Sequence, residues 1–234
     1  MVHMAETSSA RPYRGIQAGE RLAERRSRLL AAGLDLLGSD RQDISKLTVR
    51  GVCSRAALAS RYFYESFSDK DEFIGAVFDW VIADLAATTQ AAVAAAHARE
   101  QNRAAMANIV RTIANDARIG RLLFSTRLAN AVIARKRAES GALLAMLSGQ
   151  HAGDTLRIPA NDRMKAGAHF AVGGAGQAIS AWLAGDVRLE PDELVDQLAS
   201  LLDEITDPKL YGLTETTAAA TAASQNPSAA NASS

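Results

Sequence analysis

The residues best suited to chemistry lie between positions 47 and 70, where hydroxyls, guanidinium groups and aromatic rings stand close together. The segment reads LTVRGVCSRAALASRYFYESFSDK. Arg61 can donate a bidentate pair of hydrogen bonds to guanine O6 and N7, and the hydroxyls of Tyr62 and Tyr64 can donate to phosphate oxygens. Lys70 is expected at the start of a helix, where the helix dipole attracts anions. The segment therefore predicts a surface that binds DNA.

Two short helices joined by a tight turn would hold these groups in position. Thr48 is the expected N-cap of the first helix, because its hydroxyl can accept a hydrogen bond from a free backbone amide. The turn falls near residues 57–59, and residues 60–67 form the second helix. Such a pair matches a helix-turn-helix, whose second helix enters the major groove while the first crosses the backbone. Cys53, the single cysteine, is interpreted as a small buried apolar residue.

This segment resembles the DNA-binding signature of the TetR family of transcriptional regulators, which it matches without gaps from Leu47 to Phe73. The family's recurring Tyr-x-x-Phe-x-x-Lys stands here as Tyr64 to Lys70, and its upstream Leu-Thr-Val-Arg as residues 47–50. With the preceding helix included, the resemblance covers about residues 17–80. It implies a transcriptional regulator whose recognition helix is Ser60–Glu65.

The resemblance also implies roles for single residues. Phe63 and Phe67 are expected in a three-helix core. The expected DNA contacts are Thr48, Arg50, Ser60, Arg61, Tyr62, Tyr64 and Lys70. Ala57 stands where family members carry glycine in the turn, and Ala59 stands where a serine or threonine caps the recognition helix. We therefore expect a slightly recast turn in which Ser60 serves as the cap.

Charge is distributed unevenly along the chain. Its formal net charge is zero, yet residues 11–70 contain twelve Lys and Arg against seven Asp and Glu, a net charge of +5. The remaining residues therefore carry −5. Such asymmetry suggests a basic head that meets a polyanion and a body that does not.

Apolar residues recur at helical spacing along most of the 234 residues and predict an all-α fold of about nine helices, without strands. Ser68 and Asp69 stand where caps belong, ahead of a helix whose apolar stripe is Phe73, Val77, Val81 and Leu85. Loops are expected at residues 151–154 and 159–162. The longer predicted helices span residues 17–37, 70 into the Ala90s, 104–116, 119–139, 141–149, 162–185 and 191–206.

The expected organisation has four parts. They are a flexible N-terminal arm (1–15), a helix-turn-helix domain (16–69), a helical effector-binding and dimerisation domain (70–207) and a disordered tail (208–234). The tail is rich in Ala, Thr, Ser and Asn, so it cannot bury enough apolar surface to become ordered.

For the body, the family resemblance implies a homodimer, built by pairing the last two long helices, and a pocket for a small-molecule effector. Gly173, Gly174 and Gly176 lack the strand and spacing of a phosphate loop, and as small residues they favour close helix packing. The candidate interface residues are Phe170, Gly174, Ile179, Leu194, Leu198 and Leu201. The candidate pocket residues are Met106, Phe124, Leu128, Met146, His169 and Trp182.

Other function classes find less support. The sequence has no His-Glu-x-x-His, no Gly-x-Ser-x-Gly and no cysteine pair, so we expect neither catalysis nor a metal, and no cofactor. An architectural protein that coats DNA would need basic charge along much of its length. No signal peptide or membrane span is recognised, which favours the cytoplasm. The function expected is a repressor that binds a palindromic operator as a dimer and is released by an effector.

Overall fold

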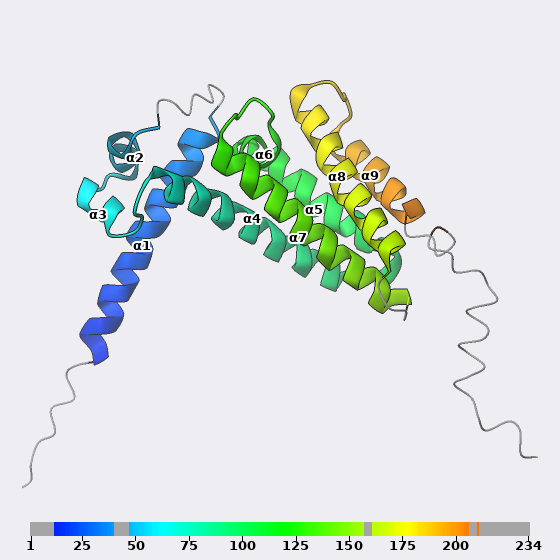
Figure 1. Cartoon of the computed structure of the whole chain (residues 1–234), viewed down its shortest axis with the longest axis horizontal. Coiled ribbons are helices and arrows are strands. Elements are labelled where there is room, and N and C mark those ends of the chain that lie inside the picture. The colour runs from blue at the N-terminus through cyan, green and yellow to red at the C-terminus, as the bar shows by residue number, and fades with distance from the viewer. Residues whose placement is uncertain (1–11, 40–46, 157–160, 206–209, 211–234) are drawn as a thin grey trace, which may run out of the picture. The chain divides into compact units, whose positions relative to one another are not determined.

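The computed structural model describes residues 12–39, 47–156, 161–205 and 210, and this part of the chain is all-helical (Figure 1). It contains nine α-helices and one 3-10 turn, Ala98–Glu100. The predicted fold class and helix count are confirmed. The expected arm lies largely outside the described residues, as does almost all of the expected tail.

The chain divides into two compact units, residues 1–84 with 116–136, and residues 85–115 with 137–234. The first unit contains α1 (Pro12–Leu37), α2 (Val49–Ala56), α3 (Ser60–Tyr64), the first half of α4 (Lys70–Ala95) and α6 (Ala117–Phe124). This division differs from the expected boundary at residue 70. The reason is that α6 packs on the end of α1, where a Cβ at Gly38 would lie 2.7 Å from the backbone of Arg118.

Aromatic side chains form the core of the first unit. Phe63, Phe67 and Phe73 are buried, and their ring centroids lie 5.1–5.5 Å apart. The predicted stripe of α4 is buried as expected, and leucines of α1 complete the core. Gly33 lets α1 approach α4 closely, because a Cβ there would lie 2.5 Å from Val77. The buried leucines of α1 are Leu29, Leu30, Leu34 and Leu37.

Among the helices of the described residues, α4 has the length and composition that a membrane span would need. Its first half nevertheless packs inside the first unit, where Phe73, Ile74 and Val77 are completely buried. A core helix of this kind passes the same test of length and composition.

The second unit contains α5 (Gln101–Asn115), most of α7 (Ala131–Leu156), α8 (Asp162–Ala184) and α9 (Pro191–Ile205). Ion pairs tie α5 to α9, with Arg103 lying 2.6 Å from Asp196 and Arg111 lying 3.0 Å from Asp192. The side chain of Asn161 caps α8 by accepting a hydrogen bond from the Met164 amide at 3.1 Å.

Several predicted helix boundaries are wrong. The helix α1 begins at Pro12 rather than near residue 17, so the end of the expected arm is helical. The helix predicted over 119–139 divides at residues 125–130, because Asn130 caps a new helix by accepting from the Val132 amide. That helix, α7, continues to Leu156 through the expected break near 140 and the expected loop at 151–154. A glycine inside a helix costs only about 1 kcal/mol, so the glycines of this stretch do not end it.

Candidate DNA-binding interface

The short helix α3 has one buried and one exposed side. Phe63 is completely buried, whereas Ser60 and Arg61 are exposed and the side chain of Tyr64 is 62% exposed. Tyr62 is half-buried. Helices α2 and α3 lie together at one end of the first unit (Figure 1). A surface helix that keeps its arginine and its hydroxyls in solvent has the chemistry needed to contact phosphates and base edges.

The N-terminus of α2 presents Thr48 and Arg50, both of them exposed. Thr48 is the N-cap, as predicted: its Oγ1 accepts a hydrogen bond from the Gly51 amide at 3.0 Å. The hydroxyl proton remains available, so the same group that begins the helix can donate to a phosphate oxygen.

The turn between α2 and α3 contains a left-handed residue at Ala57, the position where family members carry glycine. Ala57 has φ 53° and ψ 48°, a conformation that costs an ordinary L-residue about 1–2 kcal/mol. The expectation that Ser60 caps α3 is wrong. Ala59 occupies the N-cap position and makes no side-chain hydrogen bond, while Ser60 is the first helical residue. The chain accepts an uncapped α3 because contacts from α1 hold the turns on either side of it.

Arg61 rests on its neighbour Tyr62. Its Nη2 donates a 2.8 Å hydrogen bond to the phenolic oxygen, and its Cζ lies 4.7 Å from the ring centroid. The hydrogen bond to Tyr62 raises the pKa of Arg61 above its ordinary value. To reach a guanine with both branches, Arg61 must exchange this hydrogen bond for contacts with the base.

The N-terminus of α4 is occupied by the chain's own carboxylates. Asp69 accepts from the Glu72 amide at 2.8 Å, and Glu72 accepts from both the amide and the hydroxyl of Ser68 at 2.7 Å. The amide of Glu72 lowers the pKa of Asp69, and the hydroxyl of Ser68 lowers that of Glu72. The predicted caps are confirmed. Since these acids satisfy the amides, the exposed side chain of Lys70 is the group left to meet an anion.

Three arginines of α1 contact the segment from Ala56 to Phe67, a role that was not predicted from the sequence. Arg26 donates to the Ser66 carbonyl at 2.8 Å and lies 4.4 Å over the ring of Phe67. Arg25 lies 4.5 Å over the ring of Tyr62. Arg28 donates to the backbone of the turn before α3. Part of the basic charge counted between residues 11 and 70 therefore stabilises the first unit internally.

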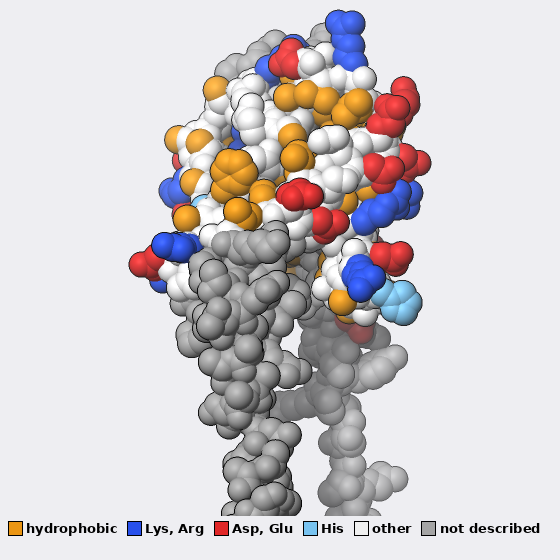
Figure 2. All heavy atoms as spheres, turned by 90° about the vertical axis from the view of Figure 1, so that its right-hand side faces the viewer, with side chains coloured by type: hydrophobic (Ala, Val, Ile, Leu, Met, Phe, Trp, Pro, Cys, Tyr) orange, Lys and Arg blue, Asp and Glu red, His pale blue; other side chains and the backbone are white. Residues whose placement is uncertain are grey.

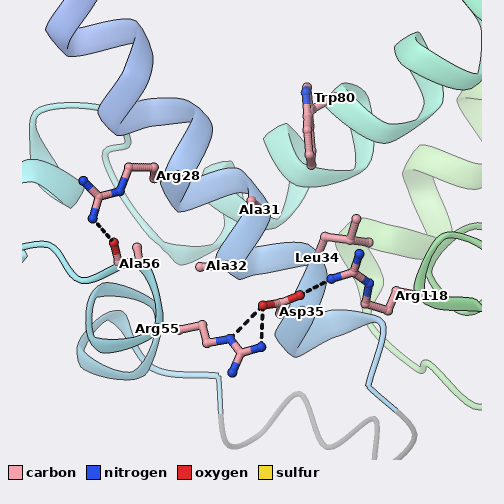
Figure 3. A pocket seen from close by; sticks show the side chains of 9 residues that line it. All are labelled: Arg28, Ala31, Ala32, Leu34, Asp35, Arg55, Ala56, Trp80 and Arg118. Atoms are coloured by element: carbon pink, nitrogen blue, oxygen red, sulfur yellow. Dashed lines mark hydrogen bonds and ion pairs between the residues drawn. The ribbon is translucent and has the colours of Figure 1, made fainter. Parts of the chain in front are cut away.

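A hollow of about 360 Å³ opens where α1, α2, α4 and α6 of the first unit meet (Figure 3). Asp35 lies in it and pairs with both Arg55 of α2, at 2.6 Å, and Arg118 of α6. Arg118 also pairs with Asp116 at 2.6 Å, and this contact lowers the pKa of Asp116. Because these charges satisfy one another, the hollow is an ion-pair junction that ties α6 and α2 to α1.

The six expected pocket residues do not line this hollow. Phe124 and Leu128 belong to the first unit and the other four to the second. Met146 is 51% exposed and His169 is exposed, whereas Met106 is buried. The indole nitrogen of Trp182 donates to the carbonyl of Leu189 at 2.9 Å.

The six expected interface residues separate into two groups. Ile179, Leu194 and Leu198 are buried within the single chain, so they cannot form an interface and belong to the core of the second unit. Phe170 is 70% exposed, Leu201 is 51% exposed and Gly174 is exposed. Figure 2 views the right-hand side of Figure 1, where hydrophobic side chains lie among acidic and basic ones.

No protein-family model and no curated protein matches the sequence. Solved structures do match its fold. A TetR-family transcriptional regulator from Streptomyces coelicolor aligns with a TM-score of 0.60 at 18% identity, over 84% of this chain and 89% of its own. The transcriptional regulator FadR from Bacillus subtilis, solved in complex with stearoyl-CoA, aligns with a TM-score of 0.60 at 14% identity, over 75% of this chain and 96% of its own.

A third match is AibR, solved with isovaleryl coenzyme A and operator DNA. It aligns with a TM-score of 0.52 at 15% identity, over 76% of this chain and 97% of its own. All three alignments cover nearly the whole of the matched chain. The likeness therefore extends over both units and is not confined to α2 and α3.

Proposed function

The chain has the fold of TetR-family transcriptional regulators, and on that premise we propose that it is a sequence-specific DNA-binding regulator. The observation that carries the proposal is the exposed side of α3, where Arg61 and Tyr64 stand in solvent above the buried Phe63. Arg61 reads base edges, while Thr48, Tyr64 and Lys70 hold phosphates on either side of the groove. Arg50, Ser60 and Tyr62 complete the contact surface.

The regulator acts as a homodimer on a palindromic operator. A single five-residue recognition helix reads too few base pairs for useful specificity, and two copies related by a twofold axis read two half-sites about 34–36 Å apart. Phe170, Gly174 and Leu201 are the candidate interface residues that the chain itself leaves exposed. Large exposed apolar side chains of this kind are typical of surfaces that meet another protein.

The effector is an acyl-coenzyme A thioester, and its binding releases the protein from its operator. Two of the matched structures hold such molecules, one with a long acyl chain and one with a short branched chain. The candidate contacts in the second unit are Met106, Met146, His169 and Trp182. A repressor relieved by its ligand, working in the cytoplasm where both its DNA and acyl-CoA are found, is the regulatory role that follows.

The test begins with a library of random duplexes, selected for binding to the full chain. Fluorescence polarisation then compares the selected duplex with a scrambled one across a salt series. A preference of about a thousandfold or more supports a sequence-reading regulator, whereas equal loss to any competitor would identify a protein that coats DNA. Stearoyl-CoA, isovaleryl-CoA and free coenzyme A are then added to the complex. Release by an acyl form, but not by free coenzyme A, supports the proposed effector class.

Replacing Lys70 by alanine should weaken binding to every DNA sequence alike. Each phosphate that a lysine neutralises contributes about 0.9 to the slope of log K against log salt, so the slope should become shallower by that amount per protomer. The measurement is the same polarisation titration at four or more salt concentrations. Lys165 on α8, which is exposed and paired with Asp162 at 2.9 Å, provides the matched control. An unchanged slope in Lys70→Ala would remove Lys70 from the DNA contacts.

A further inference from the structure

The recognition helix has little of its own to hold it in place. It is five residues long, has no side-chain cap at Ala59 and buries only Phe63. Helices this short are not stable by themselves in water, because the first turn fixes several residues for a single hydrogen bond. The direction in which α3 presents Arg61 must therefore be set by the turns on either side of it.

The turn before α3 is also strained. Ala57 holds the left-handed conformation there, and the only backbone bonds that close the turn run from the amides of Ala57 and Leu58 to the end of α2. The Leu58 amide donates to the Cys53 carbonyl at 2.9 Å. Neither bond uses the carbonyls of Ala56, the last residue of α2, or of Ala57, its C-cap.

Arg28 binds both of these carbonyls. From α1, its Nη2 donates to the oxygen of Ala56 at 2.7 Å (Figure 3). The same nitrogen donates to the oxygen of Ala57 at 3.2 Å. Hydrogen bonds from a charged donor are stronger than those between neutral groups. On the other side of α3, Arg26 donates to the carbonyl of Ser66 at 2.8 Å. Two neighbouring arginines of α1 thus bind the turns that precede and follow the recognition helix.

We propose that Arg28 is a positioning residue for DNA recognition, which holds the turn at Ala57 in the left-handed conformation that a glycine would adopt unaided. The inference rests on the proposed function, since the reading of DNA is what the turn serves. Without Arg28, the turn samples open conformations in which α3 no longer presents Arg61, and the apparent affinity for DNA falls with the fraction of closed turns. A glycine at position 57 favours the closed turn intrinsically and makes Arg28 dispensable.

The experiment compares Arg28→Ala, Ala57→Gly and the double variant in the full chain. Amide hydrogen exchange at Leu58 reports opening of the turn without any DNA, and polarisation with the selected duplex reports recognition. Arg28→Ala should speed exchange at Leu58 about tenfold and weaken specific binding by a similar factor. In the Ala57→Gly background, the same loss of Arg28 should change both quantities less than twofold. Arg21→Ala, an exposed arginine on the same helix, controls for the lost charge.

The outcomes that would overturn the inference are distinct from failure of the proposed function. Arg28 does not position the turn if Arg28→Ala and Arg21→Ala give the same exchange rate at Leu58. The same conclusion follows if Ala57→Gly restores neither the exchange rate nor the affinity for the selected duplex in the double variant. A shallower salt slope with normal exchange would make it a phosphate contact instead. If Arg28→Ala does not fold, Arg28→Lys takes its place, in the wild type and in the Ala57→Gly variant. The inference then requires that Arg28→Lys change exchange at Leu58 and DNA binding less in the Ala57→Gly variant than in the wild type. Failure of the wild type to prefer any duplex would refute the proposed function while leaving the exchange result valid.

Discussion

Replacing Arg61 by alanine should weaken binding to the selected operator by about 1–3 kcal/mol for each half-site and leave binding to random DNA nearly unchanged. The reason is that a bidentate arginine pair distinguishes one base pair from the others, whereas non-specific binding depends on phosphates alone. Arg61 is exposed and is held only by the adjacent Tyr62, so its loss removes no buried contact. Polarisation titrations of both duplexes at one salt concentration measure the difference.

Arg61→Lys is the control that separates charge from geometry. A lysine keeps the positive charge but lacks the planar fork, so it should retain non-specific affinity and lose most of the preference for the operator. Circular dichroism should show that both variants keep the helix content of the wild type. Equal losses on operator and random DNA in Arg61→Ala would mean that Arg61 binds a phosphate and reads no base.

Replacing Phe63 by alanine should lower the free energy of unfolding by about 3–5 kcal/mol, the largest change in stability we expect for a substitution in the segment 47–70. Phe63 is completely buried, and its ring lies within 5.5 Å of those of Phe67 and Phe73. Removing it leaves a cavity at the point where α3 meets the rest of the first unit. Urea denaturation followed by circular dichroism measures the shift in the midpoint.

Tyr64 is the matched control, because it is the next residue and equally aromatic but 62% exposed. Tyr64→Ala should change stability by less than about 1 kcal/mol while weakening DNA binding, since surface substitutions usually have small effects on folding. Phe63→Ala should therefore lower mainly the stability of the fold, whereas Tyr64→Ala should weaken mainly DNA binding. Similar losses of stability in both would contradict the division of α3 into a buried and an exposed side.

Local features of the segment 47–70 could be predicted because their causes are local. The cap at Thr48 depends on a hydroxyl that accepts a hydrogen bond from an amide three residues later. The left-handed Ala57 lies where family members carry a glycine. The resemblance to the family predicted that Phe63 and Phe67 lie in the core, where both are buried. The all-α class followed from the periodicity of the apolar residues along the whole chain. Each of these signals spans a few residues, so it can be recognised without knowing which elements meet.

Helix ends were predicted less well, because a helix ends where competing caps and packing decide it. The sequence analysis placed breaks near residue 140 and at 151–154, but α7 runs from Ala131 to Leu156. It also expected Ser60 to cap α3, whereas contacts from α1 make such a cap unnecessary. Propensity alone does not account for such support from another helix.

The sequence by itself determined the helical class, the reader segment and the residue types that could contact DNA. Only the tertiary structure decided what each arginine binds, since the partners lie far away in the chain. Arg28 meets the turn 28 residues later, and Asp35 meets Arg118 83 residues later. It also decided that Leu194 and Leu198 face the core of their own unit rather than a second copy. An apolar face shows that something must cover it, but which surface does so depends on how distant helices pack together.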